Sequence, residues 1–238
     1  MTFDIAQFFP SLNHQILPLI LLKASFNPKV SVFFQDYLIR KTSYFWNNFS
    51  SPTFCINMGV GQESALLLVL SAIYLSLLLH IFENRLKNLK IPVSTLSFIN
   101  NGLFISQNNS LTISNSNLFY SHYIITSLLK KFSLIIEYGK TEVFHFSRLH
   151  SSFDLPPLDL TIWEGPILYS KTTWQYLGFI FDKKLIFWQH VGFYTNKVIS
   201  TIKYMKMLSN SSKSLIPTQK RLLYRYCVLP ITLYGFLL

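Results

Sequence analysis

The chain has little cysteine. Its histidines do not follow the spacing of a metal site, and its first residues do not follow the pattern of an export signal. Its 238 residues include two cysteines, Cys55 and Cys227, whose spacing indicates neither a disulfide framework nor a metal-ligand pair. We therefore expect a reducing compartment. The six histidines are scattered, as structural or surface histidines usually are. No charged segment followed by a cleavage site opens the chain, so we expect no signal peptide and an intracellular location, nuclear or cytoplasmic.

Acidic residues are also scarce, since 10 aspartates and glutamates stand against 21 lysines and arginines. The formal charge of +11 suits binding to a phosphate backbone, where counterion release gives affinity without sequence specificity. The positive charge is concentrated in the last quarter of the chain, where Asp182 is the only acid. A solvated helix face and a nucleic-acid-binding surface both explain this concentration, and the sequence leaves the two open.

A segment centred on Asn-Asn-Gly predicts a β-hairpin. Residues 97–106 consist of two apolar runs joined by Asn100, Asn101 and Gly102. Asn and Gly accept the positive φ of a tight turn, so we expect the Asn-Gly pair to form the turn of an antiparallel hairpin over 93–106. Taken alone, this segment is typical of an ordinary surface turn.

Four further segments follow an informative order along the chain. They are Phe3–Ser11, where an acid ends a short strand before an aromatic pair, the glycine-rich Gly59–Leu66, then Glu137–Val143, and Tyr176–Phe179. Together with the hairpin they resemble the palm of non-LTR (LINE-type) retrotransposon reverse transcriptases, most closely those of fungal Tad-like elements. The matching positions are Asp4 for the family's first catalytic Asp, Gly59 to Ser64 for G-x-x-Q-G-S, Phe98 to Asn101 for F-[AV]-D-D, Lys140 for the K-T motif, Tyr176 to Phe179 for Y-L-G, and Leu229 to Gly235 for P-x-x-x-Y-G. Each motif alone is weak, but their shared order argues against accidental similarity.

The resemblance implies RNA-directed DNA synthesis by two Mg²⁺ ions, with an RNA template, a DNA primer and deoxynucleoside triphosphates as partners and no small-molecule cofactor. The implied metal ligands are Asp4, the backbone carbonyl of Ile5 and the two acids of the hairpin. Lys140 would lie near the triphosphate as an acid for the leaving group. The implied substrate-binding residues are Phe9, as the steric gate that detects a 2′-hydroxyl, and Gln62 and Ser64, which support template and nucleotide. The implied nucleic-acid contacts of the thumb are Lys197, Lys203, Lys206, Lys220, Arg221 and Arg225.

Departures from the family pattern predict a loss of catalysis. Asn100 and Asn101 replace both hairpin acids, which takes the three-acid site from a charge of −3 to −1. Loss of one preorganised electrostatic group typically lowers a rate by about 10²- to 10³-fold, so Mg²⁺ affinity and polymerase activity should both fall steeply. Glu63 stands where the family has glycine, which adds bulk and negative charge beside a polyanion. We therefore expect an inactive polymerase.

The expected fold class is α+β, a right-hand polymerase palm with a C-terminal helical, thumb-like region. Residues 1–160 would form the palm, an antiparallel sheet with packed helices, and residues 161–238 the end of the palm and a partial thumb. The family's fingers precede the first catalytic motif, so we expect them to be largely missing. The predicted strands are 2–6, a β-rich stretch at 43–57, the hairpin, 134–145 and 174–181; the predicted helices are 13–24, 28–39, 63–88, 117–132, 188–208 and 217–228. A loop over 150–170 is the expected transition between the two regions.

Three alternatives to an enzyme stay open. A non-catalytic RNA- or DNA-binding protein needs only a folded palm and the basic thumb, and a non-functional retroelement relic needs neither. The third is a membrane protein, because the 19 residues from Ser64 to Phe82 carry no charged side chain and meet the length of a membrane span. That segment also coincides with the family's buried palm helix, so the membrane protein is the least favoured of the three.

Overall fold

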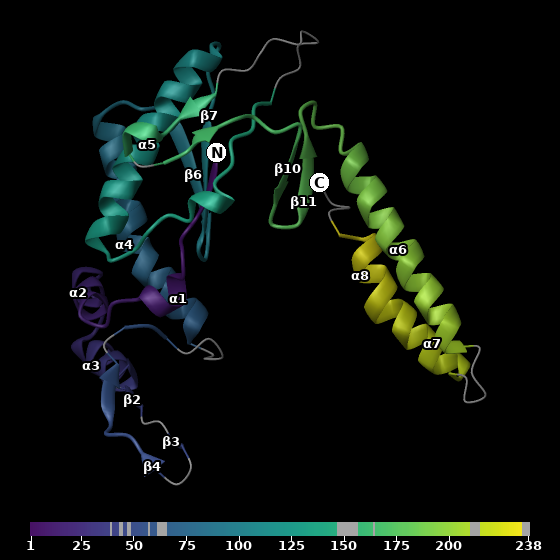
Figure 1. The fold of residues 1–238 in the computed structure, drawn as a ribbon, viewed down its shortest axis with the longest axis horizontal. Helices are drawn as coiled ribbons and strands as arrows, with labels where there is room; N and C mark the ends of the chain where they lie inside the picture. Colours follow the sequence, from purple (N-terminus) through teal and green to yellow (C-terminus); the bar gives the residue numbers. More distant parts are fainter. Residues whose placement is uncertain are drawn as a thin grey trace. The chain divides into compact units, whose positions relative to one another are not determined.

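The structure, a computed structural model, divides into two compact units (Figure 1). It describes residues 1–38, 40–42, 45–46, 49–56, 58–60, 66–146, 157–163, 165–209 and 215–234. Unit 1 consists of Met1–Val143 and Asp154–Ser170, and unit 2 of Phe144–Phe153 and Lys171–Leu238. The sequence predicts one boundary near residue 160, whereas this division falls after residues 143, 153 and 170. That the units correspond to a palm and a thumb stays a prediction.

The sheet of unit 1 has three strands in the order β1–β7–β6 and is antiparallel throughout. Its strands are β1 (Thr2–Asp4), β6 (Val93–Phe98) and β7 (Asn101–Ser106). In the central strand, Asn101 lies opposite Asp4 on one side and Phe98 on the other. The predicted strand at the start of the chain and the predicted hairpin over 93–106 are therefore confirmed.

Two long helices of unit 1, α4 (Leu67–Asn88) and α5 (Leu111–Lys131), pack against each other, and α5 also packs on the sheet. The Phe104 ring of β7 stacks on Phe82 of α4 with ring centroids 5.3 Å apart, and it lies 4.8 Å from the Phe3 ring. Such buried aromatic contacts fix α4 over the strands. The helix predicted over 63–88 is confirmed from residue 67, since residues 61–65 lie outside the described part of the chain. The helix predicted over 117–132 begins earlier, at Leu111.

The turn of the hairpin contains different residues from those predicted. Phe98 pairs with Asn101, so the two turn residues are Ile99 and Asn100, and the positive φ of 56° falls on Ile99. Gly102 lies inside β7, where it pairs with Phe3, and a Cβ on it would overlap the Phe3 ring. This glycine therefore allows a close approach between neighbouring strands. The predicted Asn-Gly turn is wrong because Gly102 is needed for packing and not for the turn.

Residues 8–56 of unit 1 contain three helices and a narrow β-ribbon. The helices are α1 (Phe8–Ser11), α2 (Ile16–Lys23) and α3 (Pro28–Leu38). The ribbon pairs β2 (Arg40–Thr42) with β5 (Phe54–Ile56) and β3 (Phe45–Trp46) with β4 (Phe49–Ser50), and Figure 1 shows it extending beyond α3. The predicted helices near 13–24 and 28–39 are confirmed, and so is the described part of the predicted β-rich stretch over 43–57.

The segment after α5 is not the strand that the sequence predicts over 134–145. It meets β1 through isolated bridges, which join Ile5 to Ile136 and Thr2 to Glu142. Between these bridges the 3₁₀-helix η1 (Tyr138–Lys140) interrupts the extended chain. Because β1 is only three residues long, it offers too short an edge to pair a strand of the predicted length.

A small hairpin occupies the described part of the loop predicted over 150–170. Its strands are β8 (Leu158–Asp159) and β9 (Ile167–Leu168), and the 3₁₀-helix η2 (Thr161–Trp163) lies between them. Asp159 begins this connection by accepting hydrogen bonds from the backbone N–H and the hydroxyl of Thr161, at 2.8 and 2.6 Å. Leu160 is buried in the core of unit 1, which ties the segment to that unit. Residues 147–156 and 164 lie outside the described residues.

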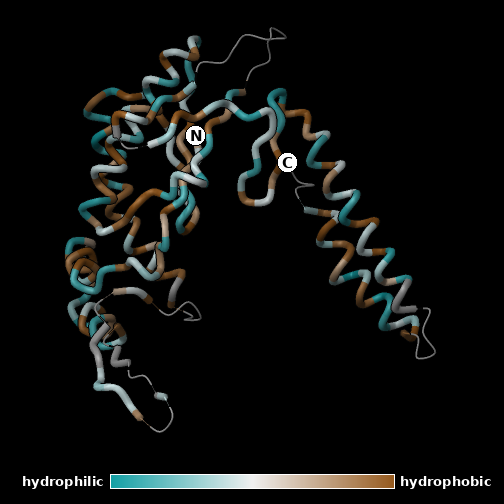
Figure 2. Tube along the Cα trace, in the orientation of Figure 1, coloured by the Kyte–Doolittle hydropathy of each residue, from teal (hydrophilic) through white to brown (hydrophobic). Residues whose placement is uncertain are grey.

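Unit 2 combines a β-hairpin with a helical pair. Its elements are β10 (Thr173–Tyr176), β11 (Phe179–Asp182), α6 (Trp188–Ser209), α7 (Pro217–Leu223), the π-helix η3 (Tyr224–Val228) and α8 (Leu229–Thr232). Helix α6 packs against η3 and α8, and hydrophobic and hydrophilic residues alternate along both partners (Figure 2). The predicted strand near 174–181 is a hairpin of two strands, and the helix predicted over 188–208 is confirmed. The helix predicted over 217–228 continues to Thr232 through the π-helical turn.

Aromatic rings make up the centre of unit 2. Trp174 is buried, and its ring stacks on Tyr176 and lies beside Phe181, with centroid distances of 5.4 and 5.0 Å. Phe144 stacks on the same indole at 6.2 Å, so the segment that follows unit 1 in sequence packs with the hairpin of unit 2. Rings of this size bury enough apolar surface to hold a small unit together.

One helix in the described part of the chain, Leu68–Asn88 within α4, is long and apolar enough by length and composition to cross a membrane. About a third of its most apolar stretch is buried inside unit 1. Tyr74 is fully buried there, and its hydroxyl donates to the backbone carbonyl of Phe132 at 2.8 Å. Core helices of soluble proteins pass the same test, so this feature is weak support for the membrane alternative.

Candidate functional site

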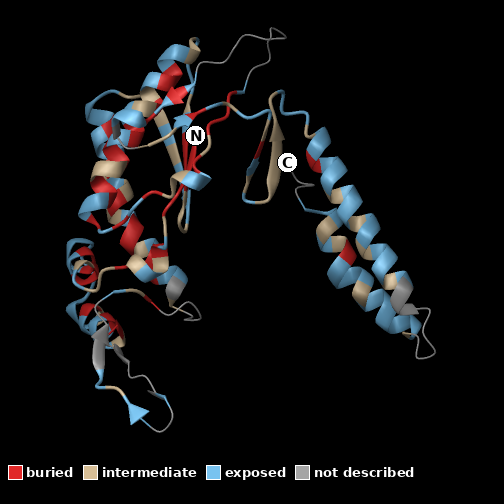
Figure 3. Cartoon of the chain, in the orientation of Figure 1, coloured by how far each residue is buried: buried red, intermediate tan, exposed pale blue. Residues whose placement is uncertain are grey.

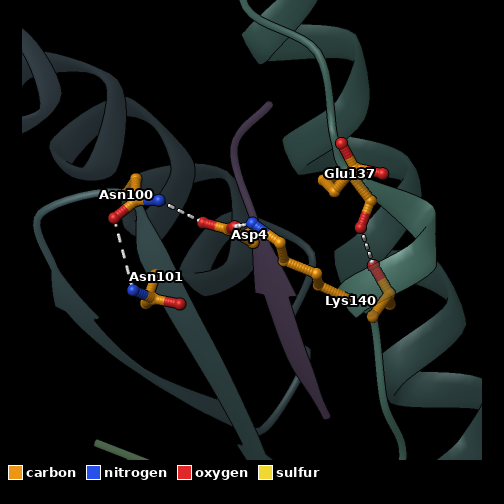
Figure 4. A network of polar contacts seen from close by, with 6 residues as sticks. Asp4, Asn100, Asn101, Glu137 and Lys140 are labelled. Atoms are coloured by element: carbon orange, nitrogen blue, oxygen red, sulfur yellow. Dashed lines mark hydrogen bonds and ion pairs between the residues drawn. The ribbon is translucent and has the colours of Figure 1, made fainter. Parts of the chain in front are cut away.

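Four residues of the expected catalytic set lie together in unit 1 (Figure 4). Asp4 ends β1 opposite Asn101, and its side chain is 7% exposed. Asn100 lies in the hairpin turn, and Lys140 ends η1. The fold thus gathers side chains from three separate parts of the sequence around one buried carboxylate.

Each carboxylate oxygen of Asp4 accepts a hydrogen bond from a neighbouring side chain. Lys140 Nζ donates to Oδ2 at 2.7 Å, and this contact is also an ion pair. Asn100 Nδ2 donates to Oδ1. Asn101 Nδ2 in turn donates to Asn100 Oδ1 at 3.3 Å, which keeps the nitrogen of the Asn100 amide directed at Asp4. The two asparagines therefore act as a short donor chain that ends on the carboxylate.

Backbone hydrogen bonds hold these residues in place. The Ile5 N–H donates to the Asn100 carbonyl at 2.9 Å, and the Glu137 N–H donates to the Asp4 carbonyl at 2.8 Å. The Lys140 N–H donates to the Glu137 carbonyl at 3.1 Å, which closes η1 and brings the lysine to the edge of the sheet. Ile5, whose carbonyl is an implied metal ligand, is buried between these contacts.

The charges of the four side chains balance. The hydrogen bond from Lys140 to Asp4 and the negative charge of Asp4 raise the pKa of the Lys140 ammonium, so it stays protonated near neutral pH. The asparagines are neutral, so the four side chains together carry no net charge. Across the residues that the structure describes, no group of three or more His, Cys, Asp or Glu side chains could hold a metal ion. The arrangement is a salt bridge supported by two amides.

The expected substrate-binding residues are described only in part. Phe9 lies in α1, is half-buried and packs against the core of unit 1. Its carbonyl accepts the Val60 N–H at 3.0 Å, which brings the start of the glycine-rich segment beside α1. Gly59 has a φ of 82°, and a Cβ there would lie 3.0 Å from the carbonyl oxygen of Pro10, so this position requires glycine. Other residues of this segment lie outside the described part, namely Gln62, Glu63 and Ser64.

In unit 2 the fold joins two motifs that are far apart in the sequence. Tyr234, from the P-x-x-x-Y-G segment, donates its hydroxyl to the Leu177 carbonyl in the Y-L-G turn at 2.6 Å. Tyr194 of α6 donates to the adjacent Gly178 carbonyl at 2.9 Å. Gly178 has a φ of 84°, and a Cβ there would come 2.5 Å from the Tyr234 hydroxyl. The turn therefore needs glycine both for its conformation and for the space that the tyrosine occupies.

His190 completes this contact, and no sequence pattern distinguishes it from the other histidines. It is buried, and its Nδ1 accepts the Ile180 N–H at 3.2 Å. Its Nε2 lies 3.2 Å from the Tyr234 carbonyl, so the neutral ring with a proton on Nε2 satisfies both partners. Because these partners are backbone groups, they leave no signature in the side-chain sequence. His190 thus connects β11, α6 and the segment after α8.

The six expected nucleic-acid contacts are all exposed on helices of unit 2, where Figure 3 shows pale blue over most of α6. They are Lys197, Lys203 and Lys206 on α6, Lys220 and Arg221 on α7, and Arg225 on η3. Two exposed tyrosines, Tyr224 and Tyr226, lie on the same π-helical turn as Arg225. Exposed cations beside exposed rings suit both phosphate binding and base stacking.

Asp182 is the only acid of unit 2, and backbone groups surround it. It accepts the N–H groups of Lys184, Ile186 and Phe187 at 3.0, 3.0 and 2.5 Å. Burial alone raises the pKa of Asp182, but these N–H groups and that of Leu185 lower it below its usual value. Unit 2 holds 11 of the 21 lysines and arginines and one of the 10 acids, so its formal charge is +10 and unit 1 is left with +1.

Comparison with known proteins relates part of the chain to one class of polymerase. No family model matches the sequence. Over 79 residues, 33% of this chain, it is 34% identical to a protein described as the probable RNA-directed DNA polymerase from transposon BS of Drosophila melanogaster. The chain spans about 8% of the length of that relative. This weak match supports a reverse-transcriptase-like relationship, in agreement with the motifs around Asp4, Asn100 and Lys140.

Proposed function

We propose that this chain is a reverse-transcriptase-like domain of a non-LTR, LINE-type retroelement that does not polymerise and that binds nucleic acid through the helices of unit 2. The match to a transposon RNA-directed DNA polymerase supports the class of protein. The observation that carries the loss of catalysis is the ion pair between Asp4 and Lys140, with Asn100 on the other carboxylate oxygen. In this proposal RNA, DNA and deoxynucleotides are ancestral partners, of which only the nucleic acids still bind.

Mg²⁺ does not fit the side chains that surround Asp4. This ion prefers carboxylate oxygens in octahedral geometry, and a two-metal site needs several of them. The network offers one carboxylate, and each of its oxygens already accepts a hydrogen bond. A divalent ion would have to displace the Lys140 ammonium and would face the Nδ2 group of Asn100. We therefore propose that Mg²⁺ binding at this site is weak.

Lys140 is also poorly placed to act as a general acid. A general acid works best when its pKa lies near the working pH. The contact with Asp4 raises the pKa of Lys140 above its ordinary value, which moves it away from that range. The resemblance implies that this lysine protonates the leaving group. In our proposal Lys140 instead neutralises Asp4.

Primer extension tests the catalytic part of the proposal. The native chain is compared with the repaired variant Asn100→Asp/Asn101→Asp/Glu63→Gly on an RNA template with Mg²⁺. We expect the repaired variant alone to extend the primer, because each restored acid is expected to recover about 10²- to 10³-fold in rate. Adding Asp4→Asn to the repaired variant is the matched control and should abolish extension.

Two outcomes of that experiment contradict the proposal. Extension by the native chain would show that the two amides do not prevent catalysis. Asn-Gly sequences are prone to deamidation, so mass spectrometry of Asn101 must first exclude a fraction that has regained an acid. Failure of both chains to extend, with cooperative melting of both, would place the loss outside the hairpin amides.

The binding part of the proposal rests on the separation of charge between the units. A domain with a formal charge of +10 and its only acid bound to backbone N–H groups suits a polyanion. We expect affinity for RNA and DNA to fall steeply as the salt concentration rises. Changing one phosphate-contacting lysine to glutamine should reduce the slope of log affinity against log salt concentration by about 1. The matched control is Lys87→Gln/Lys90→Gln, which removes exposed charges from unit 1 and should leave the slope unchanged.

The binding experiment also separates this proposal from a non-functional relic. A relic would show neither a cooperative melt nor salt-sensitive affinity for nucleic acid. Cooperative melting with affinity that is insensitive to salt would contradict a phosphate-binding surface on unit 2.

A further inference from the structure

Two aromatic side chains at the end of the ribbon of unit 1 are more exposed than any other large hydrophobic residue that the structure describes. Trp46 in β3 and Phe49 in β4 lie directly opposite each other across the ribbon. Their exposed fractions are 78% and 79%. Holding two large rings in water contributes little to folding, so their exposure points to a role in binding.

The composition of the ribbon favours a polyanionic partner with flat rings. Residues 37–62 contain no acid, and Arg40 and Lys41 on β2 give this stretch a formal charge of +2. Ser50 and Ser51 follow Phe49 directly, and Asn47 and Asn48 stand between the two aromatics in the sequence. Paired aromatic rings on a segment of net positive charge are the combination that binds unpaired bases and their phosphates.

We propose that Trp46 and Phe49, together called the aromatic tip, stack on unpaired bases of single-stranded nucleic acid. The formal charge of +2 on residues 37–62 adds attraction for a phosphate backbone. Every base has a π-face, so this contact is tolerant of sequence. The inference rests on the proposed function, because it adds a base-binding site in unit 1 to the phosphate-binding helices proposed for unit 2.

Fluorescence anisotropy with a labelled uridine-only RNA oligonucleotide tests the aromatic tip in the full chain. The variant Trp46→Leu/Phe49→Leu keeps apolar side chains but removes the flat rings. We expect its affinity for the single strand to fall roughly fivefold to a hundredfold, since base–aromatic stacking is of that size per stacked base. The salt slope should not change, because no phosphate contact is removed.

Three comparisons distinguish stacking from a loss of folding or of apolar contact. Tyr169→Leu removes another aromatic of unit 1, which is 70% exposed and lies outside the ribbon, and should leave affinity unchanged. Trp46→Phe retains a ring and should retain most of the affinity. Double-stranded RNA, whose bases are stacked internally, should bind the native chain and the double-leucine variant equally.

Several outcomes would overturn the aromatic tip. One is an unchanged single-strand affinity in a folded double-leucine variant, and another is an equal loss of affinity for single and double strands. A third is a double-leucine variant that sediments as a monomer where the native chain sediments as a dimer, with unchanged affinity. That result would show that the tip is a contact between copies. If the unit 2 lysine variants lose affinity while the tip variants do not, the proposed function stands and only the tip fails. If the native chain binds no nucleic acid, both fail.

Discussion

Unit 1 and unit 2 differ in where they place charge. Unit 1 has a formal charge of +1 and buries the carboxylate of the Asp4–Lys140 ion pair beneath a hydrogen-bonded network. Unit 2 has a formal charge of +10, and its only acid accepts backbone N–H groups. The difference teaches that the residues proposed for lost catalysis and those proposed for phosphate binding belong to separate compact units. Each set can therefore be changed while the other is monitored.

The largest expected effect is a loss of stability of unit 1 in acid, through His122. This histidine is fully buried on α5 beside the Tyr138 ring, and burial lowers its pKa to about 4. Below about pH 6.5 the unfolded chain binds a proton that the folded chain does not bind until about pH 4. Stability should therefore fall as the pH drops through this window, by up to about 3 kcal/mol.

Denaturant titrations across the same pH window measure this effect, and hydrogen exchange of α5 assigns it to unit 1. His122→Phe removes the titrating group and should flatten this part of the pH profile. A profile that His122→Phe leaves unchanged would contradict the assignment to His122.

Opposite responses to alanine at two glycines would sharpen the comparison between the units. Gly102→Ala should destabilise unit 1 by about 1 to 3 kcal/mol, because the added Cβ overlaps the Phe3 ring. Gly192→Ala, on α6 of unit 2, meets nothing within 4 Å and should stabilise its helix by up to about 1 kcal/mol. Thermal unfolding of the two variants measures both signs. Equal effects would show that the close approach at Gly102 is not costly to disturb.

Removing the partner of Asp4 should have a moderate effect confined to unit 1. Lys140→Met leaves a mostly buried carboxylate with the Asn100 donor and without its ion pair. Because the Lys140 side chain is 69% exposed, solvent screens the pair, and we expect a loss of stability smaller than that from breaking a fully buried pair. Adding Asp4→Asn should recover part of this stability in denaturant titrations. No recovery would mean that the charge of Asp4 is not the cause.

The smallest expected effect belongs to unit 2. Tyr234→Phe removes the hydroxyl that donates to the Leu177 carbonyl and should cost about 1 kcal/mol. Tyr226→Phe, at an exposed tyrosine of η3 in the same unit, is the control and should be neutral. Hydrogen exchange of the β10–β11 hairpin measures the difference, and equal protection in the two variants would contradict a stabilising role for the Tyr234 hydroxyl.

Most elements of the fold follow from local sequence patterns. The helices near 13–24, 28–39 and 188–208 and the hairpin over 93–106 match their predictions, because apolar periodicity acts between residues one turn or one strand apart. The candidate site was predicted through resemblance, which placed Asp4, Asn100 and Lys140 in one group. The direction of the hydrogen bonds was not predictable, because it depends on the Asn101 amide that orients Asn100.

Predictions failed where a distant segment determines local structure. Gly102 looks like a turn residue until the Phe3 ring packs over it, and the strand predicted over 134–145 depends on a partner, β1, that is three residues long. The contact between Tyr234 and the Leu177 carbonyl links segments 57 residues apart through a backbone acceptor, which has no side-chain signature.

By itself, the sequence determined most of the element types, the excess of positive charge and the pair of asparagines in the hairpin, because these depend on composition and near neighbours. Only the tertiary structure decided that Lys140 pairs with Asp4, that Gly102 lies under a ring and that Trp46 and Phe49 stay in water. Those outcomes depend on which surfaces meet when the chain compacts. Contacts of this kind arise between residues that local patterns treat as independent.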